Sequence, residues 1–97
     1  MSNIVVNNLV KYSQTGGELF LKFIVMNEIN DNDANVDGFV EIAKKTKANV
    51  VISRDSRAIS ERMTDSERHA AERMLNKCKY LKIPVFIAED YIRNQLN

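Results

Sequence analysis

The alternation of short apolar runs with helix-like segments predicts an α/β fold, formed by a single three-layer domain over residues 1–97. Two apolar runs, Val50–Ile52 and Val85–Ile87, enclose a polar loop and a long amphipathic helix. This strand–helix–strand order is typical of parallel strands joined by right-handed crossovers. With the segments that precede them, we expect a mixed four-stranded sheet that is parallel at its centre and carries an antiparallel N-terminal edge strand.

The composition is that of an ordinary globular domain. The 97 residues are 44% hydrophobic and 28% charged, with a net charge of +1, which suits one domain with an adequate core. No apolar run reaches the roughly 20 residues that span a bilayer, and the N-terminus lacks the features of a secretion signal. A single cysteine, Cys78, allows no internal disulfide. We therefore expect a cytoplasmic protein with no membrane contact, and the many Asn, Lys and Ile residues are typical of AT-rich phage or bacterial genomes.

The N-terminal segments predict a β-hairpin. Residues 4–12 are rich in β-branched side chains with polar residues between them, a composition typical of an edge strand. The paired Gly16 and Gly17 then supply the positive φ angles of a turn. Leu19–Met26 is interrupted only by Lys22 and is expected to be a central strand covered on both faces.

The next segment predicts a helix that begins near Asp33 or Asn35, since both residue types are good N-caps. Its apolar residues recur at helical spacing and are expected to face the sheet: Val36, Phe39, Val40 and Ala43. Its last turn is basic, as the helix dipole favours, and contains Lys44, Lys45 and Lys47. We expect Asn49 to close this helix.

A second helix follows the polar loop of residues 53–63. Thr64 and Glu67 have the spacing of a capping box, and the helix is expected to run to about Lys82, ahead of Pro84. Its expected inner stripe is Ala71, Met74, Leu75, Cys78 and Leu81. After the last strand, residues 89–96 predict a short helix that closes the domain.

The second half of the chain resembles a BRCT domain over residues 45–96. The likeness is carried by Lys45-Thr46, Asn49-Val50-Val51-Ile52, Lys77-Cys78-Lys79-Tyr80-Leu81-Lys82-Ile83-Pro84-Val85 and Glu89-Asp90-Tyr91-Ile92. Bacterial members of that family have a similar strand, a helix that leads into Ile-Pro-Ile, and a closing helix. The resemblance implies a protein- or DNA-binding module rather than an enzyme, and we carry over no phosphate pocket from it.

A second likeness concerns Glu28, which follows one predicted strand, and Asp55, which follows the next. This arrangement resembles the Toprim layout of metal-dependent nucleic-acid enzymes, in which an Asp-x-Asp pair holds Mg²⁺. Here Arg57 stands in place of the second carboxylate of that pair, and a cation repels a metal. A degenerate Toprim-like enzyme is therefore a third hypothesis.

The loop after the strand at residues 50–52 is the sharpest candidate for a ligand site. In open parallel sheets, ligands bind beyond the carboxyl ends of the strands. This loop combines hydroxyls, Arg side chains and a helix N-terminus, which together suit a phosphate. The candidate phosphate-binding residues are Ser53, Arg54, Ser56, Arg57, Ser60, Arg62, Ser66 and Arg68. The alternative is a solvated loop in which Asp55 and Glu61 pair with the arginines.

The remaining polar residues predict no catalytic or metal site. His69 falls on the polar side of its helix, among ordinary helix neighbours, and Cys78 falls on the apolar stripe as a small buried hydrophobe. One Cys and one His cannot form a structural zinc site. The acidic residues between Glu28 and Asp37 lack the spacing of an EF-hand and are expected to form a solvated capping loop.

These observations favour a non-enzymatic, BRCT-like binding module that associates with a protein or a nucleic acid. Association with a second copy, as a homodimer through the exposed N-terminal strand, is one form of this hypothesis. The alternative is a binder of a small phosphorylated, nucleotide-type ligand through the loop from Ser53 to Arg68. The Toprim-like enzyme comes third, and the favoured hypothesis requires no cofactor or metal.

Overall fold

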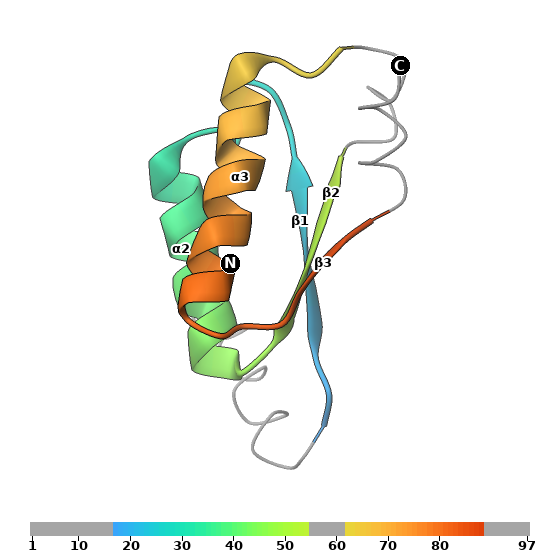
Figure 1. Cartoon of the computed structure of the whole chain (residues 1–97), viewed down its shortest axis with the longest axis vertical. Coiled ribbons are helices and arrows are strands. Elements are labelled where there is room, and N and C mark those ends of the chain that lie inside the picture. The colour runs from blue at the N-terminus through green and yellow to red at the C-terminus, as the bar shows by residue number, and fades with distance from the viewer. Residues whose placement is uncertain (1–16, 55–61, 89–97) are drawn as a thin grey trace.

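The computed structural model describes residues 17–54 and 62–88, which contain three parallel strands and two helices (Figure 1). In chain order the elements are β1 (Phe20–Val25), α2 (Asp33–Thr46), β2 (Asn49–Arg54), α3 (Asp65–Tyr80) and β3 (Val85–Ile87). Strands and helices alternate, so the predicted α/β class is confirmed. No helix within these two ranges is long and apolar enough to cross a membrane.

The sheet has the order β1-β2-β3, and each strand runs parallel to its neighbour. Phe20 lies opposite Asn49 where the β1–β2 ladder begins. Residues 50–52 of β2 lie opposite residues 85–87 of β3. The prediction that these two apolar runs are adjacent, parallel and joined by a long helix is confirmed.

Both helices cover the same face of the sheet and contact each other, and Figure 1 shows them on one side of the three strands. Crossovers of one hand that step in the same direction across a parallel sheet place successive helices on one side. The described residues thus form two layers. The predicted antiparallel edge strand at residues 4–12 and the closing helix at residues 89–96 lie outside the described residues.

The core lies between the sheet and the helices and consists of small and branched apolar side chains. Its fully buried members include Val25, Val36, Val40, Val50, Ile52, Met74 and Cys78. Phe23 of β1 packs edge-on against Phe39 of α2, with ring centroids 5.1 Å apart, in a favoured aromatic geometry. The predicted inner stripe of α3 is in the core, although Leu75 and Leu81 are only partly buried.

The expectation that β1 is a central strand covered on both faces is wrong for the described part of the chain. Its side chains alternate between exposed and buried. Phe20 is 54% exposed and Ile24 is 38% exposed, whereas Phe23 is only 4% exposed. The cause is the one-sided placement of the helices, which cover only the face that carries Phe23. β1 also lies at an edge of the described sheet rather than at its centre.

The boundaries of α2 differ slightly from the prediction. Its N-cap is Asn32, whose side-chain oxygen accepts from the N–H of Asn35, rather than Asp33 or Asn35. Its C-cap is Lys47, which adopts the left-handed conformation with φ of 55°, rather than Asn49. Asn49 instead begins β2, where its N–H donates to the backbone just before β1.

The start of α3 is as predicted, whereas its end and the preceding loop are shorter. The Thr64 hydroxyl accepts from the N–H of Glu67, and the Glu67 carboxylate accepts from the N–H of Thr64, so the capping box is confirmed. The helix ends at Tyr80 rather than near Lys82, which has a left-handed φ of 59°. β2 extends into the predicted loop as far as Arg54.

Candidate functional site

The sheet face opposite the two helices is a candidate binding surface. No helix or strand of residues 17–54 and 62–88 lies on it. Its outward side chains, which we call the bare sheet face, are Phe20, Lys22 and Ile24 on β1, Val51 on β2 and Phe86 on β3. Contiguous exposed apolar surface of this kind marks interaction sites more often than isolated apolar residues do.

Two aromatic rings dominate the bare sheet face. Phe20 is 54% exposed and Phe86 is 52% exposed, and their ring centroids are 6.2 Å apart. The strand register places Lys22, Val51 and Phe86 in one row across the sheet. The surface is therefore apolar at its centre and has a single cation at its β1 margin.

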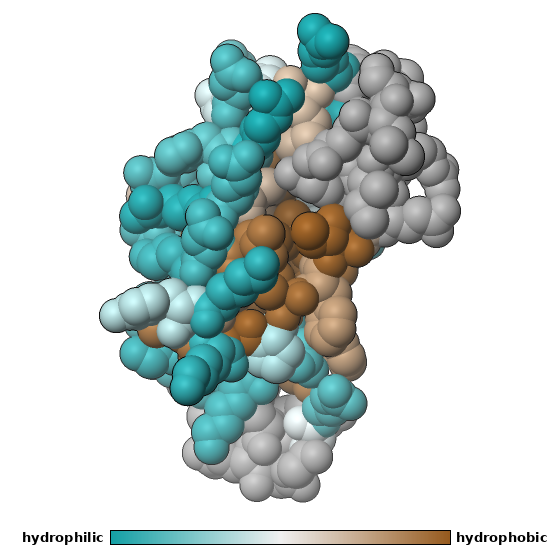
Figure 2. Space-filling view, viewed as in Figure 1, coloured by the Kyte–Doolittle hydropathy of each residue, from teal (hydrophilic) through white to brown (hydrophobic). Residues whose placement is uncertain are grey.

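The apolar surface continues around β3 toward α3. Ile87 points to the helix side of the sheet and is 41% exposed. It lines a small depression of about 30 Å³ together with Ile52, Ala71 and Leu75, and Glu72 is the one charged residue of the lining. Figure 2 shows apolar residues gathered over β3 and its seam with α3, with hydrophilic residues over the outer sides of the helices. The β3 edge is thus apolar on both of its faces.

The outer edge of β1 is a second candidate surface. The N–H of Asn49 donates to the carbonyl of Leu19, so the backbone groups of Leu19 face β2. Backbone direction alternates along a strand, so the N–H and C=O of Lys22 point away from β2. No strand in the described part of the chain pairs with this edge, and an open edge can accept a further strand.

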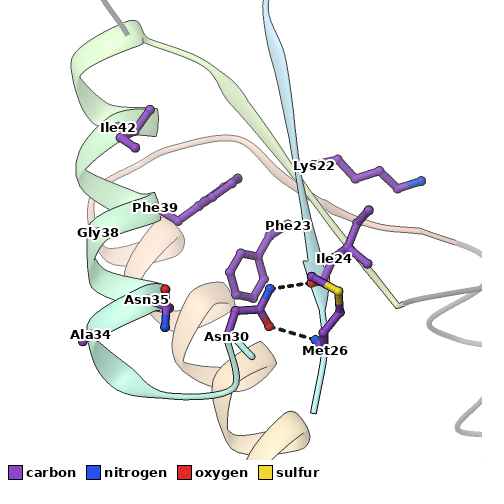
Figure 3. Close-up of a pocket in the computed structure, with 10 residues that line it drawn as sticks. All are labelled: Lys22, Phe23, Ile24, Met26, Asn30, Ala34, Asn35, Gly38, Phe39 and Ile42. Carbon is purple, nitrogen blue, oxygen red and sulfur yellow. Dashed lines mark hydrogen bonds between the residues drawn. The ribbon is translucent and has the colours of Figure 1, made fainter. Parts of the chain in front are cut away.

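Asn30 covers one end of that edge (Figure 3). Its side-chain Nδ2 donates to the carbonyl of Ile24 at 2.7 Å, and its Oδ1 accepts from the N–H of Met26 at 2.8 Å. The amide side chain thereby takes the place of a neighbouring strand for these two backbone groups. The edge that remains open begins at Lys22 and runs toward the start of β1.

A groove of about 470 Å³ lies between β1 and α2 beside this edge (Figure 3). The rings of Phe23 and Phe39 and the side chain of Ile42 line it from the two elements, and Asn30 lies at one end. Its walls are therefore mostly apolar, with backbone groups along the β1 side. This combination suits a peptide segment in extended conformation.

The structure places two of the predicted phosphate-binding residues inside the protein. Ser53 is 1% exposed and Arg54 is 2% exposed, and both belong to β2 rather than to the loop. The Nε of Arg54 lies 3.6 Å from Oε2 of Glu67, whose side chain is also buried. These two residues therefore do not lie at the surface where a ligand would bind.

The other predicted phosphate-binding residues divide into two groups. Ser56, Arg57 and Ser60 lie outside the described residues. Arg62, Ser66 and Arg68 are exposed close to the start of α3, and Arg68 lies 3.8 Å from Asp65 on the same helix. Within the described residues, Arg62 and Arg68 are the members of the set that present a cation at the surface.

Glu67 occupies the N-terminus of α3 and connects it to β2. One carboxylate oxygen accepts from the N–H of Thr64 at 2.9 Å, and the other faces Arg54. Removing one partner of a buried ion pair leaves an uncompensated charge, which is strongly destabilising. The arginine and glutamate therefore serve to fix α3 against the end of β2.

An ion-pair network joins α2 to α3 on the outside of the helical layer. Asp37 accepts from both Nε and Nη2 of Arg73 at 2.9 Å and from Nζ of Lys77 at 2.8 Å. Asp33 lies 3.2 Å from Nε2 of His69. The hydrogen bonds from Arg73, and then those from Lys77, hold the pKa of the Asp37 carboxyl well below its usual range. The bond to Asp37 likewise raises the pKa of Arg73.

The described residues bring no catalytic set together. His69 is exposed and faces a carboxylate on the neighbouring helix. Cys78 is fully buried, and burial raises the pKa of its thiol, as expected for a core residue. No cluster of three or more His, Cys, Asp or Glu within these ranges could hold a metal ion. Glu28 is exposed in the turn after β1, and Asp55 lies outside the described residues.

The sequence did not reveal the roles of three polar residues in these surfaces. Asn30 caps the β1 edge, although nothing distinguishes it within its polar loop. Asp37 binds Arg73 from 36 positions away, and no local spacing signals such a contact. Glu67 was expected as a cap, and its buried contact with Arg54 becomes visible only once β2 and α3 are placed together.

Comparisons of the chain with protein-family models, with curated proteins and with solved structures found no match. The inference of function therefore depends on the surfaces described above.

Replacing Asp37 with Asn should weaken the acid dependence of stability. A carboxyl whose pKa is lower in the folded protein contributes stability above its unfolded pKa of about 3.9, and this is lost as pH falls through the folded value. Denaturant unfolding of the wild type should therefore lose stability as pH falls below about 4, and the variant should lose less. Glu41→Gln, an exposed change on the same helix, is the control. Identical pH curves for Asp37→Asn and wild type would contradict this role.

Proposed function

We propose that this chain is a non-enzymatic binding module that associates with a protein partner through the bare sheet face. The observation that carries the proposal is the pair of half-exposed rings, Phe20 and Phe86, on a sheet face that no described element covers. Full burial of a Phe side chain contributes roughly 1.5–3 kcal/mol, so covering two rings supports a stable contact. A binding module of this kind is also what the BRCT-like resemblance implies.

The chemistry of the bare sheet face favours a protein over a nucleic acid. Its one cation is Lys22, whereas nucleic-acid affinity depends on several Lys or Arg contacts to phosphates. Apolar and aromatic residues at the centre with polar groups at the margin are typical of protein interfaces. The complementary partner surface is therefore apolar, with a carboxylate positioned to meet Lys22.

A photoreactive benzophenone amino acid in place of Phe86 should capture this partner in an extract of the source cells. Irradiation should give one discrete protein adduct, because the group sits in the proposed interface. The same amino acid in place of Ile29, which is 64% exposed in the loop after β1, is the matched control and should give no such adduct. Adding Phe20→Ser to the Phe86 variant should abolish the adduct without changing the circular dichroism spectrum.

An adduct with twice the mass of the chain would identify the partner as a second copy. Equal capture from positions 86 and 29, or a nucleic acid in the adduct, would contradict association with a protein at this face.

We also propose that residues 4–12 complete a four-stranded sheet as an antiparallel strand on the outer edge of β1. The open backbone groups of Lys22 and the apolar groove beside Phe39 and Ile42 support this arrangement. The connection is short, since Gly16 and Gly17 lie just before β1. A hairpin of this kind would protect the edge from pairing with other chains.

Hydrogen exchange at the Lys22 amide tests this hairpin. In the full chain the Lys22 N–H should be protected, and deletion of residues 1–12 should make it exchange much faster, since its partner is removed. The Phe23 N–H points toward β2 and should stay protected in both proteins, which makes it an internal control. Rapid exchange of the Lys22 amide in the full chain would exclude a paired edge.

A second candidate function, the binding of a phosphorylated nucleotide-type ligand, is favoured by the exposed Arg62, Ser66 and Arg68 near the start of α3. Millimolar ADP should then raise the melting temperature of the wild type. It should raise that of the double variant Arg62→Ala, Arg68→Ala much less, because the two cations that bind phosphate are lost. Lys22→Ala removes an exposed cation from the sheet, away from α3 and the basic residues at the helix ends, and serves as the control. Equal shifts in all three proteins would rule out this site.

A further inference from the structure

The C-terminal ends of α2 and α3 form a strongly basic surface. Figure 1 shows both helices ending at the same end of the molecule, and Figure 2 shows mostly hydrophilic residues over the helices toward that end. The ion pairs require the same arrangement, since Asp33 meets His69 and Asp37 meets Arg73 one turn later on each helix. The exposed lysines there, which we call the basic end, are Lys44, Lys45, Lys47, Lys79 and Lys82.

The positive charge of the basic end is largely uncompensated within the described residues. None of its lysines makes an ion pair with a carboxylate of residues 17–54 and 62–88. Carboxylates contact other cations instead, namely Arg54, Arg68, Arg73 and, in the last turn of α3, Lys77. Residues 41–49 and 77–88, which form this end and continue from it, contain one acidic residue, Glu41, and six lysines, so positive charge predominates there.

The helix dipole explains only part of this cluster. Lysines in the last turn of a helix, such as Lys44 and Lys45, stabilise it. Lys47 and Lys82, however, follow the last helical residues and adopt left-handed φ angles of 55° and 59°. Glycine or asparagine is the usual residue in this conformation. The chain thus has a lysine at two positions where the backbone favours another residue, and both add to the same surface.

An aromatic side chain lies among these lysines. Tyr80 is 86% exposed, more than any other large hydrophobic residue described, and its side chain makes no ring contact or hydrogen bond with the described residues. On α3 it follows Arg73 and Lys77 along the stripe that faces α2. Arg73 of α3 lies opposite Asp37 of α2. Two turns further along each helix, the same register brings Tyr80 to the level of Lys44.

We propose that the basic end binds single-stranded nucleic acid, with its lysines contacting phosphates and Tyr80 stacking on an unpaired base. Basic grooves combined with an exposed aromatic ring are the usual means of binding single strands with little sequence preference. The Tyr80 ring can stack only on a base that is free to leave its own stack. A duplex would therefore contact the lysines but not the ring. This surface is separate from the bare sheet face, and the inference goes beyond the protein association proposed above.

Fluorescence anisotropy with labelled oligothymidine tests the inference in the full chain. The logarithm of the binding constant should fall linearly with the logarithm of salt concentration, with a slope of about −0.7 for each phosphate contacted. Lys47→Gln, Lys82→Gln should reduce that slope by about 1.4 and weaken binding. Lys22→Gln removes an exposed lysine from the sheet face, and it should leave both the affinity and the slope unchanged.

Replacing Tyr80 separates stacking from charge. Tyr80→Ala should weaken oligothymidine binding by roughly tenfold at one salt concentration without changing the salt slope, and Tyr80→Phe should restore the affinity. Wild-type affinity in both the Tyr80→Ala and the double lysine variant, with unchanged thermal melts, would overturn the proposal. Binding to phosphatidylserine vesicles but not to oligothymidine would also overturn it. Tyr80, Lys47 and Lys82 lie outside the bare sheet face, so failure of this proposal is distinguishable from failure of the proposed protein interface.

Discussion

Each strand of the sheet is joined to the next by a helical crossover, and both crossovers step the same way, from β1 to β2 and from β2 to β3. Crossovers of one hand must then place α2 and α3 on the same face. The core, the Phe23–Phe39 contact and the ion pairs between the helices all depend on this shared side. The same constraint exposes the opposite face, with Phe20 and Phe86 on it, and it also brings the basic ends of the helices together.

Some polar residues of the described chain form contacts within the protein, whereas others remain exposed at its surface. Arg54 and Glu67 are buried and hold the start of α3 against β2, and Asp37 binds two cations of the neighbouring helix. These groups are already engaged within the protein. An apolar sheet face and a cluster of lysines that lack described partners remain for other molecules. The two binding proposals depend on these surfaces.

Much of the fold follows from local pattern, because periodicity, caps and breakers act over a few residues. The strand at residues 85–87, the capping box at Thr64 and the burial of Cys78 are examples. The one-sided coverage of β1 was not predicted, since an apolar run looks the same whether one or both faces are covered. The sequence predicts Arg54 in a surface loop, because the burial of an arginine depends on a carboxylate that comes close only in the folded chain. The placements of residues 4–12 and 55–61 remain predictions.

The most direct test of this account is a nuclear Overhauser experiment on the aromatic rings of the full chain. The rings of Phe20 and Phe86 should show contacts with each other and with the methyl groups of Val51, and none with the methyl groups of Val40 or Met74. The ring of Phe23 should contact Phe39 instead. Contacts from Phe20 or Phe86 to Val40 or Met74 would place those rings under the helices and would contradict the one-sided architecture.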